Sequence, residues 1–196
     1  ELINDFWPVS NFGPIKFANF NNDTHLDFII LYANYDNENF KVKTDSIFVK
    51  NFSGDGAGNF EMVQDTLLFA NENAYYFIAS FITANIQVAD MDFNGYDDII
   101  AVLNYEYFES AQHFLLEFRK QEDGFHLNTL HGEGYSDKSG SMGQQSLNVC
   151  NINNDNFPDL MKLSFNFNHI PYLDGMLNNN GTGYSNLPGT YYGSAA

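Results

Sequence analysis

Three stretches of this 196-residue chain repeat one spacing of asparagine and aspartate. They read "NFNNDTHLDFIIL" from Asn19, "DMDFNGYDDIIAV" from Asp90 and "NINNDNFPDLMKL" from Asn151. Positions one, three, five and nine are Asn19, Asn21, Asp23 and Asp27 in the first; Asp90, Asp92, Asn94 and Asp98 in the second; Asn151, Asn153, Asp155 and Asp159 in the third. The chain holds 27 Asn and 16 Asp, a content that gives about 0.4 such matches by chance. Three matches therefore indicate an internal repeat.

The residues that flank these loops repeat as well. A short strand-like segment precedes each loop, "PIKFA", "NIQVA" or "SLNVC", and a nearly continuous apolar run follows it. Such runs are typical of strands buried on both faces. Further along, each repeat has a turn with Gly that ends in an aromatic residue, Phe60, Phe125 or Tyr184, as in a hairpin.

This order of elements predicts an all-β fold made of three four-stranded antiparallel blades of β-propeller type. The approximate blades are residues 10–78, 79–140 and 141–196, within a single repeat region that spans residues 1–196. The segment "SAQHFLLEFRKQ" has some helical character, but its aromatic residues and its place in the repeat favour a strand. The third repeat lacks a clear fourth strand after "GTGYSN", and we expect that strand to come from residues before Phe12 or from another subunit. The tail "LPGTYYGSAA" is interpreted as a frayed end rather than a strand lent to a neighbour.

Three blades are fewer than the four to eight that close a propeller. The chain is then part of a longer propeller, or copies complete a ring, or copies stack head to tail into a filament.

The loops have the chemistry of a cation site. Side-chain oxygens at positions one, three, five and nine, with a backbone carbonyl at position seven, can surround one Ca²⁺ ion, whereas Mg²⁺ demands a tighter octahedron. The position-seven carbonyls are those of His25, Tyr96 and Phe157. An EF-hand is rejected, because position twelve lacks its Glu and the flanking segments are strand-like. The alternative is a loop without metal, closed by Asn and Asp side chains that bond to nearby backbone N–H groups.

The pattern D-x-D-x-D-G-x-x-D between two strands resembles the calcium loops of FG-GAP and VCBS repeats, the blades of integrin-α-like β-propellers. The Phe12-Gly13 pair before the first loop and the Gly-aromatic turns are similar to that family too. The resemblance implies bound calcium, a secreted or cell-surface location, and a role in adhesion or ligand binding.

The three loops depart from this pattern to different degrees. Position six, where the family has Gly, is Gly95 in the second loop but Thr24 in the first and Asn156 in the third. Three ligand positions are acidic in the second loop and only two in each of the others. Because fewer charges weaken Ca²⁺ binding, we expect affinity to fall from the second loop to the third and then the first.

Composition limits the partners. The formal net charge is −17, from 25 acids and 8 bases, which argues against nucleic acid because phosphate contacts need Lys and Arg. No apolar window is long enough for a membrane span. Sequons at Asn22, Asn51 and Asn180 support secretion weakly.

No catalytic motif such as H-x-x-x-H or G-x-S-x-G occurs in the sequence, so the chain is predicted not to be an enzyme. The predicted function is an extracellular calcium-binding module that acts non-catalytically in adhesion or ligand binding, with a protein or a glycan as its partner. The alternative is a structural subunit that assembles with copies of itself.

Overall fold

The computed structural model describes residues 11–33, 46–70, 78–79, 86–107, 110–135, 146–165, 171–187 and 190–191. These residues form strands and turns. None of them belongs to a helix that could cross a membrane. Segments rich in β-branched and aromatic residues, separated by Asn, Asp and Gly, favour such an arrangement. The predicted all-β fold is confirmed.

The first sheet follows chain order. It consists of β1 (Asn11–Ala18), β2 (Asp27–Ala33), β3 (Ser46–Gly54) and β4 (Phe60–Ala70), each antiparallel to the next. The three loops with the repeated spacing of asparagine and aspartate are called Asx loops. The first Asx loop connects β1 to β2, and the Gly-rich turn that ends in Phe60 connects β3 to β4.

The second sheet repeats this order. Its strands are β5 (Ile78–Ala79), β6 (Ile86–Ala89), β7 (Asp98–Tyr107), β8 (Ser110–Gln121) and β9 (Gly124–Tyr135). Both β6 and the two-residue β5 pair with β7, which continues to β8 and β9. The segment "SAQHFLLEFRKQ" is β8, as the repeat predicted.

The third sheet also has its fourth strand. It contains β10 (Ser146–Cys150), β11 (Asp159–Phe165), β12 (Pro171–Asn178), β13 (Tyr184–Asn186) and β14 (Thr190–Tyr191). Both β13 and β14 pair with β12. The expectation that this strand comes from the N-terminal residues or another subunit is therefore wrong, and part of the tail interpreted as frayed forms β14.

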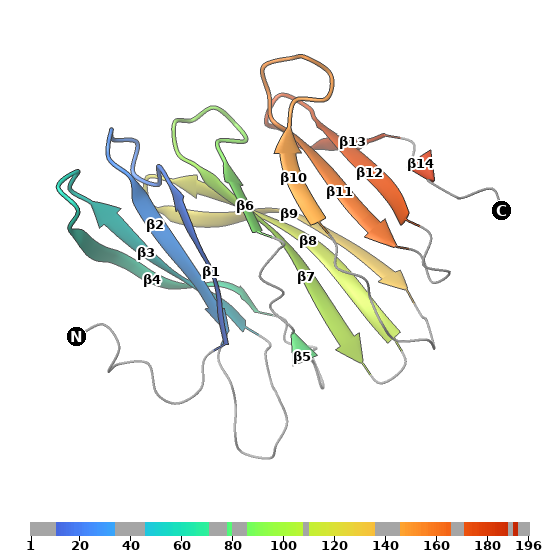
Figure 1. The fold of residues 1–196 in the computed structure, drawn as a ribbon, viewed down its shortest axis with the longest axis horizontal. Coiled ribbons are helices and arrows are strands. Elements are labelled where there is room, and N and C mark those ends of the chain that lie inside the picture. The colour runs from blue at the N-terminus through green and yellow to red at the C-terminus, as the bar shows by residue number, and fades with distance from the viewer. Residues whose placement is uncertain are drawn as a thin grey trace.

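The three sheets stand side by side as blades. Their first strands lie next to one another, β1 beside β6 and β6 beside β10, and β4 lies beside β9. All three Asx loops lie at the same end of the array, at the top of Figure 1. The described residues thus form three consecutive antiparallel blades of propeller type.

Two hydrophobic layers join the blades, because the middle sheet is buried on both faces. The layer between the first and second sheets contains Ala18, Phe20, Ile29, Leu31, Ile47, Val49, Ile86, Ile99, Ala101, Leu116 and Phe118. The layer between the second and third sheets contains Met91, Ile100, Leu115, Leu147 and Leu160. Burial of one such Ile or Leu side chain stabilises the fold by about 1.5–3 kcal/mol.

Successive residues of a strand point to opposite faces, which gives each sheet two faces that we name. The front face points toward the preceding sheet, as Ile99 and Ala101 do in the second sheet. The back face points toward the following sheet, as Ile100 does. Ile99, Ile100 and Ala101, which follow one another in β7, are each at most 2% exposed. Their burial on both faces explains the continuous apolar run after the second loop.

The sequon at Asn51 lies inside this arrangement. Asn51 is 3% exposed, on the strand of the first sheet that carries the buried Ile47 and Val49. Its side-chain oxygen has no hydrogen-bond partner. Asn22 and Asn180, by contrast, are exposed. A glycan on the folded chain is therefore compatible with Asn22 and Asn180 but not with Asn51.

Candidate metal centre

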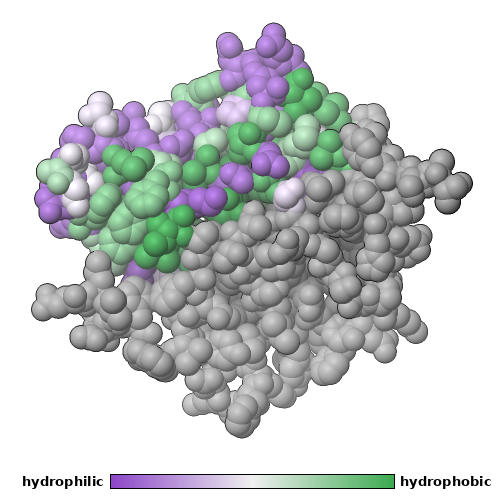
Figure 2. Space-filling view, in the orientation of Figure 1, coloured by the Kyte–Doolittle hydropathy of each residue, from purple (hydrophilic) through white to green (hydrophobic). Residues whose placement is uncertain are grey.

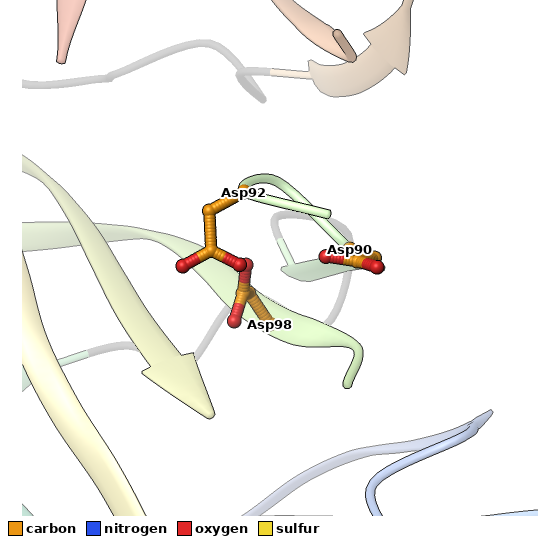
Figure 3. Close-up of side chains that lie close together, drawn as sticks. All are labelled: Asp90, Asp92 and Asp98. Atoms are coloured by element: carbon orange, nitrogen blue, oxygen red, sulfur yellow. The ribbon is translucent and has the colours of Figure 1, made fainter. Parts of the chain in front are cut away.

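The second loop gathers three carboxylates. Asp90 and Asp92 lie on the loop after β6, and Asp98 is the first residue of β7. One carboxylate oxygen from each lies within 4.8 Å of those from the other two. Figure 3 shows the side chains of Asp92 and Asp98 close together near the centre of the view, with Asp90 to their right. This acidic triad has the oxygen-only donor set that hard cations prefer.

Asp98 holds the loop against the rest of its sheet. It is fully buried, and its two carboxylate oxygens accept hydrogen bonds from the backbone N–H of Met91 at 2.9 Å and of Lys120 at 2.7 Å. Burial raises the pKa of Asp98 to about 7, although these two hydrogen bonds oppose the rise, and the nearby charges of Asp92 and Glu117 add to it. The raised pKa means that the Asp98 carboxyl holds a proton more readily than an exposed aspartate does, and a nearby cation would favour its charged form.

The other residues of this loop are fixed by local bonds. Asp90 accepts from the backbone N–H of Asn94 at 3.1 Å and of Gly95 at 2.9 Å. The Asn94 side chain accepts from the N–H of Tyr96 at 2.8 Å and donates to the carbonyl of Lys120 at 2.9 Å. Gly95 has a φ of 91°, a conformation that other residues rarely adopt.

A buried basic residue balances part of the negative charge. Arg119 on β8 is 8% exposed, and its guanidinium lies 3.6 Å from the Asp92 carboxylate. It also lies 3.4 Å from Glu117 and donates to the carbonyl of Gly181 in the third sheet. Glu117 in turn accepts from the Tyr184 hydroxyl at 2.9 Å. The triad is thus connected through Arg119 to the interface between the second and third sheets.

Sequence reasoning missed this network. Glu117 and Arg119 stand two residues apart, next to the apolar and aromatic residues of "FLLEF". Two charged residues on one face of a strand with buried neighbours are the signal that would have indicated a paired, buried site.

The first and third loops close in a different way. In the first, the Asn21 amide donates to the Asp23 carboxylate at 2.7 Å, and the Asn19 amide donates to the Asp23 carbonyl at 2.9 Å. Asp23 accepts from the N–H of His25 at 2.6 Å.

The third loop repeats these bonds residue for residue. Asn153 donates to the Asp155 carboxylate at 2.7 Å, Asn151 donates to the Asp155 carbonyl, and the N–H of Phe157 donates to Asp155 at 2.7 Å. Asparagine amides in these two loops thus occupy positions that are carboxylates in the second loop.

All three loops share the use of their ninth residue. Asp27 and Asp159 are as buried as Asp98. Asp27 accepts from the N–H of Phe20 at 2.9 Å and Gly54 at 3.0 Å, at positions that match Met91 and Lys120. Asp159 accepts from the N–H of Ile152 at 2.7 Å and Asn178 at 2.8 Å. The ninth carboxylate therefore joins each loop to the third strand of its own blade, a role that the sequence pattern did not reveal.

The left-handed residue of the loops is at position four. Asn22, Phe93 and Asn154 have φ values of 59°, 58° and 60°. At position six, only Gly95 has a positive φ among the described loop residues. Thr24 and Asn156 therefore do not carry the strain that the family pattern suggested.

The donor sets differ in how well they fit a metal ion. The second loop brings three carboxylates together, and within the described residues no other group of three acidic, His or Cys side chains does so. In the first loop the buried side-chain oxygen of Asn19 has no hydrogen-bond partner, as expected of an oxygen available to a cation. The residues of the second loop therefore fit a metal ion best, and the acidic triad could bind one.

No family model and no curated protein matches this chain. One solved structure is similar, that of the rhamnogalacturonan lyase YesW, with a TM-score of 0.59 and 12% sequence identity. The match covers 95% of this chain and 35% of that one, so this chain spans about a third of the length of its structural neighbour. At this identity the likeness concerns the fold alone.

The expectation that the chain is not an enzyme is overturned by this comparison, because the structural neighbour is a lyase. That expectation rested on missing short motifs. A blade array of this kind occurs in a catalytic protein, so neither the fold nor the lack of a motif excludes catalysis.

Proposed function

We propose that this chain is a calcium-binding module of β-propeller type that acts outside the cell and binds a ligand, for which a glycan is the best candidate. The observation that supports it is the acidic triad of Asp90, Asp92 and Asp98, with one oxygen of each within 4.8 Å of the others. Three carboxylates this close repel one another when all are charged, and a bound cation would relieve this repulsion.

Calcium is favoured over other metals by the donor set. The loop supplies only oxygen ligands, with the Asn94 side chain and the Tyr96 carbonyl as further candidates. Ca²⁺ accepts six to eight oxygens in flexible geometry, and extracellular modules bind it at about 10⁻⁴–10⁻³ M. When bound, the ion would neutralise the carboxylates and stabilise the folded loop.

The rim beside the triad supports a glycan as ligand. Phe93 is 52% exposed, and its ring centroid lies 4.8 Å from that of Phe157 on the third loop. An exposed aromatic surface next to a cation site suits the apolar face and the hydroxyl groups of a sugar ring. The similarity to a protein named for its action on a polysaccharide also supports this class of ligand.

Calcium titration by isothermal calorimetry tests the proposal. We expect the wild-type chain to bind Ca²⁺, and Asp90→Asn to weaken this binding at least about tenfold because one charged ligand is lost. Asp123→Asn is the matched control, since Asp123 is an exposed acid of the same sheet that lies outside the triad. Equal binding by both variants, or no binding by wild type in millimolar calcium, would overturn the site.

A second candidate function is cleavage of a polysaccharide, supported by the similarity to a lyase. The test is incubation with rhamnogalacturonan in the presence of calcium. A lyase leaves a carbon–carbon double bond in its product, so ultraviolet absorbance would rise with time. A flat absorbance together with saturable binding to immobilised glycan would favour the binding module over the enzyme.

A further inference from the structure

The front face of the first sheet is apolar and exposed. Five of its neighbouring side chains are between 42% and 54% exposed: Ile15, Phe17, Phe60, Met62 and Leu67. Figure 2 shows hydrophobic surface over the first sheet, at the left, below the hydrophilic loops. Contiguous apolar surfaces of this kind are uncommon on isolated proteins and mark interaction sites.

The repeat identifies what such a face contacts. The residue after the ninth position of each loop is Phe28, Ile99 or Leu160. Ile99 packs in the layer between the first and second sheets, and Leu160 packs in the layer between the second and third. Phe28 is the corresponding residue of the first sheet and stacks on Phe52 of its own sheet, with ring centroids 4.4 Å apart. No sheet precedes it among the described residues.

The aromatic residues that end the turns, Phe60, Phe125 and Tyr184, also indicate that the front face of a sheet contacts the preceding blade. Phe125 in the second sheet lies 5.9 Å from Phe20 of the first sheet, between ring centroids. Tyr184 in the third sheet donates to Glu117 of the second. Phe60, at the same place in the first sheet, is 42% exposed. In both internal cases this aromatic therefore contacts the preceding blade, and in the first sheet it has no such contact among the described residues.

The opposite end of the array carries the matching surface. Phe20 and Met91, at position two of their loops, are fully buried in the layers toward the following blade. The third loop has Ile152 at this position, and it is only partly buried. On the same side of the third sheet, Met161 lies opposite Gly175 in register. The back face of the third sheet is therefore apolar, with Ile152, Met161, Leu173, Leu177 and Leu187 all partly exposed.

The front face of the first sheet carries one pair of opposite charges in register. Lys50 and Asp65 lie opposite each other on the front face of the first sheet and form an ion pair at 2.8 Å. The charges that stand in register on this face are thus paired with each other, and their burial costs less than burial of a lone charge.

We propose that the front face of the first sheet binds the back face of the third sheet of a second copy of this chain. The contact would repeat the two blade interfaces that the chain already contains, and its two surfaces differ, so copies join head to tail into a ring or a row. This inference does not rest on the proposed calcium function.

The test is the native mass of the full chain by light scattering across a range of concentrations, in calcium. We expect a mass above that of the monomer that rises with concentration. Phe17→Glu on the front face and Met161→Glu on the back face should each weaken association at least about tenfold, because each places a charge in an apolar interface. Leu26→Glu is the control: Leu26 is 56% exposed but lies in the first loop, and its variant should associate as wild type does.

Mixing the two variants distinguishes this contact from others. Each variant keeps one intact face, so an equimolar mixture should form a one-to-one pair and no larger species. A wild-type chain that is monomeric at every concentration would overturn the proposal. So would a Met161→Glu variant or a Phe17→Glu variant that self-associates like wild type.

Discussion

The second loop brings three carboxylates within 4.8 Å of one another, whereas the first and third loops place asparagine amides beside a single aspartate. Asn21 and Asn153 donate to Asp23 and Asp155, both at 2.7 Å. The ninth aspartate, however, is buried and accepts at least two backbone N–H groups in all three loops. The comparison separates two functions of one motif: its last residue joins the loop to the rest of its blade, and its first residues set how well the loop could bind a cation.

The largest effect is expected where the three loops agree. Asp98→Ala leaves the N–H groups of Met91 and Lys120 without acceptors, and should lower the free energy of unfolding by about 2–4 kcal/mol in calcium-free buffer. Asp27→Ala and Asp159→Ala should cost about as much, as measured by urea denaturation. Asp123→Ala, at an exposed site, should stay within about 0.5 kcal/mol of wild type. A much smaller loss at Asp27 than at Asp98 would show that the shared role is wrong.

Exchange of the residues that differ between the second and third loops should add a calcium site to one loop or remove it from the other. Asn151→Asp with Asn153→Asp gives the third loop the acids of the second, and should raise the calcium stoichiometry by one. Asp90→Asn with Asp92→Asn should remove the calcium-dependent gain in stability, which is about 2.7 kcal/mol at one hundred times the dissociation constant. Melting temperatures with calcium and with chelator measure both changes. Retained calcium response in the Asp90, Asp92 double variant would count against the comparison.

The triad should also make calcium binding depend on pH. Burial raises the pKa of Asp98 from 3.8 to about 7, so the folded calcium-free chain holds a proton that the unfolded chain releases above about pH 4. Stability without calcium should therefore fall as pH rises from about 4 to 7. Calcium competes with this proton, so its affinity should fall about tenfold for each pH unit below 7. A calorimetric affinity that is equal at pH 5.5 and pH 7.5 would contradict this.

The smallest effect concerns position four, where the second loop has Phe93 at a φ of 58° and the other loops have asparagine. Asparagine tolerates this conformation better than phenylalanine does. Phe93→Asn in a Phe157→Ala background, which removes the ring contact beforehand, should stabilise the chain by about 1 kcal/mol. Thermal unfolding of the four proteins of this double-mutant cycle measures the effect. Destabilisation in that background would mean that Phe93 is not strained.

The sequence predicted most of the frame, because the loops and the apolar runs after them occur three times. Burial of Ile99, Ile100 and Ala101 on both faces of the middle sheet explains why no alternation was visible there. The fourth strand of the third sheet was missed because it is split into β13 and β14, with only three and two residues. Strands this short leave no periodic pattern.

The site was predicted less completely. The spacing identified Asp90, Asp92 and Asp98, but it assigned the same role to the asparagines of the other loops, since Asn and Asp offer the same ligand atom in a pattern. Whether an amide turns its oxygen or its nitrogen toward a neighbouring carboxylate depends on three-dimensional contacts. Arg119 comes from another strand, 21 residues after Asp98 in the chain, and local spacing cannot reveal it.

The buried sequon at Asn51 has a consequence for the order of events when the chain is made. In a cell that attaches glycans to nascent chains, Asn51 is accessible only until the first two sheets meet, because it is 3% exposed afterwards. A sugar added before that moment would keep the sheets apart, while one added at Asn22 or Asn180 would remain on the surface. Expression hosts without this modification should therefore yield more folded protein, and Asn51→Gln should recover the difference in hosts that have it.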